Sequence, residues 1–174
     1  MNAQDRLDAL EVALGNETRE REFYLANAER IKNPVGKTMF RKIAAEEVEH
    51  YQRLKKLHEK WVQREQWPDT VPLTVKQTEV GNVLAEVIRD MGEPPTGDSN
   101  DLEAVRTAID FEQKGSAHYA KLRDMVSDPK EKQFFDLLSK IEHEHYQSLR
   151  DTEEFFIDPA DWYRREEHHS IDGA

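Results

Sequence analysis

The sequence predicts an all-α protein: a four-helix bundle made of two duplicated helical hairpins joined by a long crossover connection. Charged residues make up 35% of the 174 residues and only seven residues are glycine, which favours long solvated helices over a β-sandwich. The chain also matches itself at an offset of 95 residues without a gap. Apolar residues recur at helical spacing throughout both matching segments.

The internal match aligns residues 7–59 with residues 102–154. The pattern Glu-x-x-His occurs once in each segment, and the polar identities include Glu17/Glu112, Tyr24/Tyr119, Glu47/Glu142 and His50/His145. A chance alignment would not place all of these side chains in register. The match therefore indicates duplication of a helical hairpin.

Four helices are expected, at residues 3–31, 35–65, 99–126 and 129–156. Asn33-Pro34 and Asp128-Pro129 mark the start of the second helix of each hairpin. In both places an Asx residue caps the helix and proline occupies its first position.

Residues 66–98 connect the two hairpins, and prolines lie near both ends of this segment. Within it, residues 75–91 can form a helix that packs on the bundle through Val80, Val83, Leu84 and Val87. A connection this long fits a bundle with one crossover better than a simple up-down-up-down bundle. We therefore expect one bundle domain over residues 1–156.

The remaining residues, 157–174, form a C-terminal docking tail in this interpretation. The tail carries Trp162 and Tyr163 and then a polar end. We expect these aromatic side chains to dock on a neighbour or on a second subunit.

The repeated Glu and His residues occupy apolar helix faces. Glu47 and His50 lie on the stripe of Ile43 and Leu54, and residues three apart share one face of a helix. Four carboxylates buried together are unstable unless they are protonated or neutralised by cations. Two divalent cations would balance the four charges, and carboxylate with imidazole suits iron, manganese or zinc.

At these residues the chain resembles the ferritin-like di-iron carboxylate proteins, and most closely their rubrerythrin-like branch, over roughly residues 5–156. The resemblance implies two iron ions. It implies that Glu17 and Glu112 are ligands from the first and third helices, that Glu47 and Glu142 bridge, and that His50 and His145 bind one metal each. Tyr24 and Tyr119 resemble the tyrosines that line such sites; a buried tyrosine with a hydrogen-bonded hydroxyl is the other interpretation.

Two departures from the family pattern matter. Rubrerythrins have a further carboxylate three residues after the third-helix Glu, where this chain has Gly115, whereas the matching position on the first helix is Glu20. Glu20 is thus either a seventh, exchangeable ligand near the metal held by His145 or a surface residue. The chain also has no cysteine, so it lacks the rubredoxin-like centre and needs an external electron donor, such as a rubredoxin or a flavin reductase.

The resemblance favours a di-iron enzyme that reduces hydrogen peroxide or dioxygen. A ferroxidase that oxidises Fe(II) for storage or detoxification is one alternative, and a non-catalytic metal-binding bundle is another. A net charge of -11 argues against nucleic acid or an anionic membrane as a partner. Without a leader or a spanning apolar run, we expect a cytoplasmic protein, and the family suggests a homodimer.

Overall fold

The structure is a computed structural model that describes residues 3–64, 78, 80–84, 86–87 and 98–171. In these residues it contains α1 (Ala3–Arg30), α2 (Pro34–Arg64), a 3-10 turn η1 (Val80–Asn82), α4 (Ser99–Met125), α5 (Pro129–Ile157) and α6 (Pro159–Ile171). No strand is present in this part of the chain. The predicted all-α class is confirmed, and α1, α2, α4 and α5 correspond to the four expected helices.

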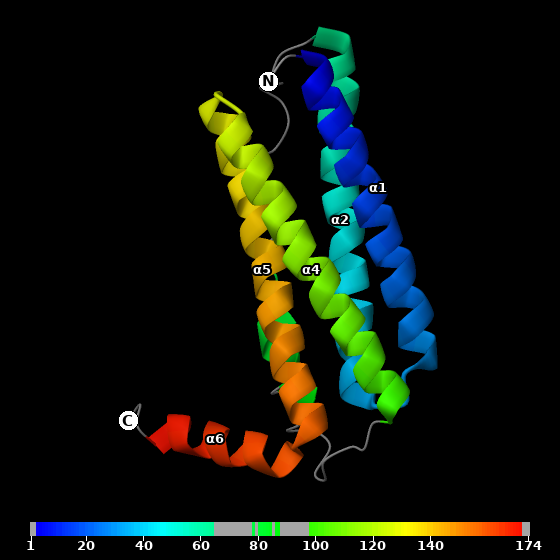
Figure 1. Cartoon of the computed structure of the whole chain (residues 1–174), viewed down its shortest axis with the longest axis vertical. Helices are drawn as coiled ribbons and strands as arrows, with labels where there is room; N and C mark the ends of the chain where they lie inside the picture. Colours follow the sequence, from blue (N-terminus) through cyan, green and yellow to red (C-terminus); the bar gives the residue numbers. More distant parts are fainter. Residues whose placement is uncertain (1–2, 65–77, 79, 85, 88–97, 172–174) are drawn as a thin grey trace.

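The four long helices form two antiparallel hairpins that pack side by side (Figure 1). In one hairpin α1 pairs with α2, and in the other α4 pairs with α5; across the bundle α1 contacts α4 and α2 contacts α5. In Figure 1, α2 ends at the upper end of the bundle and α4 begins at the lower end. The end of α2 and the start of α4 therefore lie at opposite ends of the bundle, as a crossover requires.

Side-chain caps explain why the second helix of each hairpin begins at its proline. The Oδ1 atom of Asn33 accepts hydrogen bonds from the backbone N–H of Val35, at 2.9 Å, and of Gly36, at 3.3 Å. Asp128 in the same way accepts from Lys130 and Glu131, at 2.8 and 3.2 Å. Each cap satisfies donors that have no partner within the helix, which confirms the predicted starts.

The crossover segment contributes apolar side chains to the core. Val80, Val83 and Leu84 are buried and Val87 packs against the same cluster, as predicted. The structure shows a 3-10 turn at Val80–Asn82, and the described residues that follow it, 83–84 and 86–87, are α-helical. The other residues of the expected helix at 75–91 lie largely outside the described part.

The C-terminal segment forms a helix that the sequence analysis did not predict. α6 leaves the bundle at a steep angle to α5 (Figure 1). Its Trp162 and Tyr163 lie against Phe155 of α5, with ring centroids 5.6 and 6.2 Å from that of Phe155. These aromatic side chains thus have a docking surface within their own chain.

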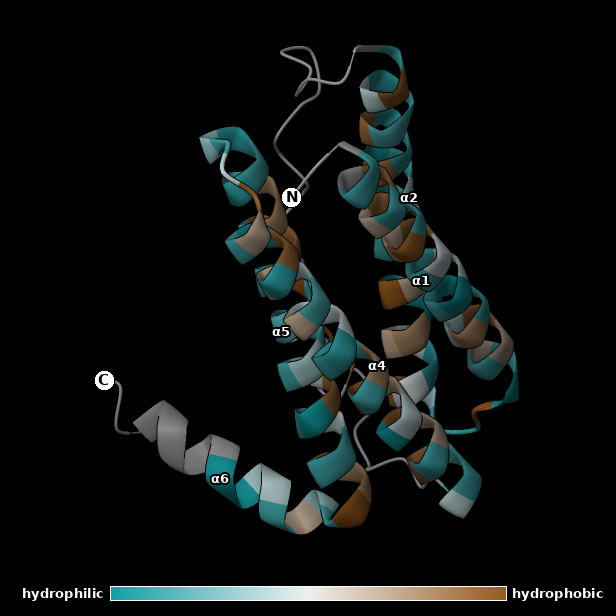
Figure 2. Cartoon of the chain, turned by 45° about the horizontal axis from the view of Figure 1, so that its top comes forward, coloured by the Kyte–Doolittle hydropathy of each residue, from teal (hydrophilic) through white to brown (hydrophobic). Residues whose placement is uncertain are grey.

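Two hydrophobic clusters fill the bundle, one toward each end. The first contains Tyr24, Phe40 and Phe155, and the second contains Leu10, Trp61 and Phe134 among others. Hydrophobic and hydrophilic residues alternate along each helix in Figure 2, as expected for helices that bury one stripe. On each long helix, the Glu or Glu-x-x-His that is repeated between the two halves lies between residues of the first cluster and residues of the second. A polar layer therefore separates the two clusters.

None of the described helices combines the length and apolar character needed to cross a membrane.

Candidate metal centre

The polar layer brings together the six side chains that the sequence singled out. Each is at most 1% exposed: Glu17 on α1, Glu47 and His50 on α2, Glu112 on α4, and Glu142 and His145 on α5. Their ligand atoms form two groups, and within each group these atoms lie no more than 4.8 Å apart. The first group is Glu17, Glu47, His50 and Glu142, and the second is Glu47, Glu112, Glu142 and His145. Glu47 and Glu142 belong to both.

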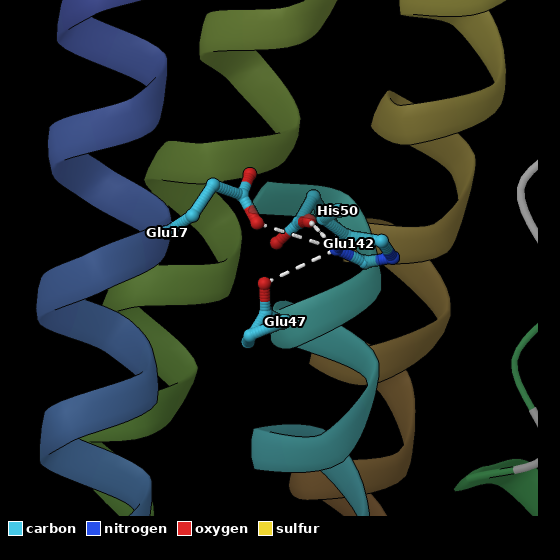
Figure 3. A group of neighbouring side chains, drawn as sticks. All are labelled: Glu17, Glu47, His50 and Glu142. Carbon is cyan, nitrogen blue, oxygen red and sulfur yellow. Dashed lines mark hydrogen bonds and ion pairs between the residues drawn. The ribbon is translucent and has the colours of Figure 1, made fainter. Parts of the chain in front are cut away.

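The first group converges on one nitrogen of His50 (Figure 3). Its Nδ1 atom lies 3.1 Å from Oε2 of Glu47, 3.4 Å from Oε2 of Glu17 and 3.5 Å from Oε1 of Glu142. Three helices, α1, α2 and α5, therefore aim these side chains at one point.

The second group is the counterpart around His145. The Nδ1 atom of His145 lies 3.3 Å from Oε2 of Glu112 and 3.5 Å from Oε1 of Glu47. The His145 and His50 rings are nearly parallel, with centroids 6.1 Å apart. The duplication visible in the sequence is thus a duplication of site geometry.

The two predicted tyrosines cross between the hairpins. The hydroxyl of Tyr24 on α1 donates to Oε1 of Glu112 on α4, and the hydroxyl of Tyr119 on α4 donates to Oε1 of Glu17 on α1. Both rings are buried and pack in the hydrophobic clusters. The two tyrosines therefore fill the core, and their hydroxyls also hold the outer carboxylates, which are those of Glu17 and Glu112.

The carboxyl groups of the cluster divide into two pairs by their affinity for protons. Burial, reinforced by the charges of Glu47 and Glu112, raises the pKa of Glu142 well above its usual range. Burial likewise raises the pKa of Glu47 to about 8. Burial also acts on Glu17 and Glu112, but His50 and His145 beside them outweigh it and lower both pKa values.

The pKa values of the two imidazoles are also raised. Burial works against their charged form, yet Glu47 raises the pKa of His50 well above its usual range. Glu112 and Glu46 raise the pKa of His145 to about 10. A cation that enters this cluster must displace protons, because imidazole and carboxylate bind metals in their deprotonated forms.

Buried side-chain atoms without a hydrogen bond indicate whether the cluster suits metal ions. Among the described residues, the buried side-chain atoms that have no hydrogen bond include Glu17 Oε2, Glu47 Oε1, Glu112 Oε2, both oxygens of Glu142 and His145 Nδ1. Buried polar atoms are normally satisfied, and leaving one unpaired costs about 1–3 kcal/mol. Two cations would satisfy all of them. The donor set therefore fits a pair of metal ions, and the assignment of each residue as a ligand stays a prediction.

Glu20, the predicted seventh ligand, is only 9% exposed, so it is not an ordinary surface residue. Burial, with the charges of Glu47 and Glu112, raises its pKa to about 9. Neither group of ligand atoms within 4.8 Å includes Glu20. Its coordination of a metal stays a prediction.

Gly115 has a steric role at the site. A Cβ atom at this position would lie 3.1 Å from Oε2 of Glu142, so a side chain there would press on a shared carboxylate. Gly115 and Glu20 also line a cavity of about 400 Å³ between α1 and α4, together with Asn16, Arg19, Phe111, Lys114 and His118. Gly115 therefore lies in the cavity wall and next to a carboxylate of the cluster.

Sequence comparison between the halves missed Glu46. Its Oε2 atom lies 2.8 Å from Nε2 of His145, on the side of the ring away from the cluster. Glu46 corresponds to Ile141 in the second half, so matching identical residues does not find it. The sequence feature that could have pointed to Glu46 is its position directly before the ligand candidate Glu47.

The comparisons with known proteins agree with this geometry. A family model described as Rubrerythrin matches residues 8–153. No curated protein and no solved structure matches the chain.

Proposed function

The chain belongs to the rubrerythrin family, and from this premise we propose that it is a di-iron oxidoreductase that reduces hydrogen peroxide or dioxygen. The observation that carries the proposal is the pair of buried ligand groups that share Glu47 and Glu142. In this proposal Glu17 and His50 hold one iron, Glu112 and His145 hold the other, and the shared carboxylates contact both.

Reduction of hydrogen peroxide to two waters requires two electrons and two protons, and a bound iron pair would supply the electrons, one from each metal. The protein's own contribution is to orient the ligands and to limit water. Tyr24 and Tyr119 hold the outer carboxylates by hydrogen bonds, and the hydrophobic clusters close the site toward both ends of the bundle.

The cavity beside Gly115 supports a small oxidant as substrate. A volume of about 400 Å³ admits hydrogen peroxide or dioxygen, and Gly115, which lines the cavity, packs against Glu142. We propose that substrate approaches between α1 and α4 by this route. Glu20, in the wall of the cavity, is proposed as the seventh, exchangeable ligand.

We propose that electrons come from a separate donor. The sequence contains no cysteine, so it has no thiolate-bound iron centre that could pass electrons to the pair. A rubredoxin or a flavin reductase is the proposed donor, and a homodimer is the proposed assembly.

Anaerobic loading with Fe(II), followed by separate additions of hydrogen peroxide and air, tests the proposed activity. We expect two irons per chain, fast oxidation by peroxide, slower oxidation by air, and renewed turnover after re-reduction. Glu142→Ala should remove the reaction and Glu144→Gln, an exposed neighbour, should not. Fast oxidation by air with uptake beyond two irons would indicate a ferroxidase instead, and bound iron that neither oxidant changes would indicate a non-catalytic centre.

A further inference from the structure

The duplication copies all six ligand candidates but not the residue behind the histidine. On α2, Glu46 lies 2.8 Å from Nε2 of His145. The matching position in the other half is Ile141, which is 2% exposed and has no side-chain atom able to accept a hydrogen bond. The two halves of the centre therefore differ at this position, in addition to the difference between Glu20 and Gly115.

This contact fixes the tautomer of His145. An ionised carboxylate only accepts hydrogen bonds, so Nε2 of His145 carries the hydrogen and donates it to Glu46. The lone pair of a neutral ring then lies on Nδ1, the atom that faces Glu112 and Glu47 and has no hydrogen bond. A carboxylate in this position orients the imidazole and makes it a stronger metal ligand.

We infer that Glu46 is a positioning residue that makes the two metal positions unequal. The metal at His145 binds more tightly and is loaded first, and the metal at His50 occupies the weaker, more labile position. The inference rests on the proposed metal centre, but not on the reduction of peroxide. It follows from the hydrogen bond between Glu46 and His145 and from the apolar residue at the matching position.

Titration of the metal-free protein with Co²⁺, followed by visible absorption, measures both positions without any redox step. We expect two binding steps in the native protein. Glu46→Ala should weaken the tighter step by about tenfold or more and leave the weaker step unchanged. Glu46→Gln keeps an acceptor without the charge and should lie between the two. The matched control is Glu144→Gln, an exposed carboxylate directly before His145.

A double-mutant comparison assigns the effect to one position. With His50→Ala, the remaining metal lies at His145 and Glu46→Ala should weaken it by a similar factor. With His145→Ala, Glu46→Ala should have no effect on the metal that remains. Equal effects in the two backgrounds, or no effect in either, would overturn the inference. Thermal unfolding followed by circular dichroism establishes that each variant is folded.

The outcomes separate this inference from the proposed function. Two Co²⁺ ions with unequal affinities that depend on Glu46, in a protein that does not turn over peroxide, would support the inference and contradict the proposed activity. Peroxide turnover with two Co²⁺ affinities that Glu46→Ala leaves unchanged would do the reverse. Binding of fewer than two Co²⁺ ions by the native protein would overturn both.

Discussion

Glu142 contributes to both ligand groups, and both of its buried oxygens are without hydrogen bonds. Glu142→Gln keeps the size and the buried position but removes the negative charge that two cations require. We expect the variant to fold as the native protein does, because burial raises the pKa of this carboxyl group well above its usual range and so favours its neutral form. Paired iron binding should be lost, as measured by iron per chain after anaerobic loading. Two irons retained at native affinity would show that Glu142 is not a shared ligand.

The hydrogen bonds of Tyr24 and Tyr119 should contribute to the stability of the metal-free protein. Tyr24→Phe leaves Glu112 without its donor, and Tyr119→Phe does the same to Glu17. A hydrogen bond to a charged group contributes about 1.5–3 kcal/mol, so each variant should lower the free energy of unfolding by that order. Urea denaturation of the metal-free protein measures it, with Tyr146→Phe on α5 as the control. An unchanged free energy in both variants would mean that these hydroxyls contribute nothing to the fold.

The duplicated residues were predictable because a repeat reveals what both halves kept. All six ligand candidates and both tyrosines were found this way, and the structure brings them together. A functional residue that is present in only one half cannot be found by matching the halves. Glu46 matches Ile141, and the packing of Gly115 against Glu142 depends on how closely α4 approaches α5, which sequence spacing does not encode.

At the scale of the helices, one contact is present at matching positions of both hairpins, but the acidic and basic residues have exchanged places. Arg106 of α4 pairs with Glu153 of α5 at 2.7 Å. The matching positions in the first hairpin are Glu11 and His58, which lie 3.4 Å apart. The acidic partner is on the second helix in one hairpin and on the first helix in the other. A search for identical residues in the two halves does not detect this contact, because neither of its positions carries the same residue in both hairpins.

Asp101, near the start of α4, joins the two hairpins. Its carboxylate accepts hydrogen bonds from the backbone N–H groups of Lys32, at 3.1 Å, and Asn33, at 2.9 Å, in the turn between α1 and α2. Asp101→Ala leaves these donors without their acceptor and should destabilise the protein by about 1.5–3 kcal/mol. Asp101→Asn should cost less, and the exposed Glu103→Ala serves as a control for thermal unfolding. A native melting temperature for Asp101→Ala would contradict this role.

The starts of α2 and α5 were predicted from local signals, whereas α6 was not predicted although it has the same kind of cap. Asn33 and Asp128 cap the helices that were predicted from them, since capping is a local interaction. In α6, Asp158 caps in the same way, accepting from the N–H of Asp161 at 2.9 Å. The polar composition after Tyr163 masked this helix. Its direction is set by Trp162 and Tyr163 packing on Phe155, a tertiary contact.

For the molecule as a whole, the buried cluster makes stability depend on pH. The pKa values of Glu47 and Glu20 rise from 4.5 to about 8 and about 9, and that of His145 rises from 6.5 to about 10. The folded metal-free protein therefore binds more protons than the unfolded chain between about pH 6 and 9, so its stability falls as pH rises. Glu17 and Glu112, whose pKa values are lowered, are ionised in both states over this range and add no slope.

Melting temperatures measured from pH 6 to 9, with and without metal, test this expectation. The metal-free protein should lose stability steadily, and the metal-loaded protein should lose much less, because cations take the place of the protons. Metal affinity should accordingly rise with pH. A melting temperature of the metal-free protein that rises over this range would contradict the protonation pattern assigned to the cluster.

The central claim is that six side chains from four helices hold two metal ions between the hydrophobic clusters. Anomalous diffraction at the iron edge from crystals of the iron-loaded protein tests it most directly. The account predicts two iron peaks in the polar layer, one bound by Glu17 and His50, the other by Glu112 and His145, and both in contact with Glu47 and Glu142. A single peak, no peak in the layer, or iron bound elsewhere on the acidic surface would contradict it.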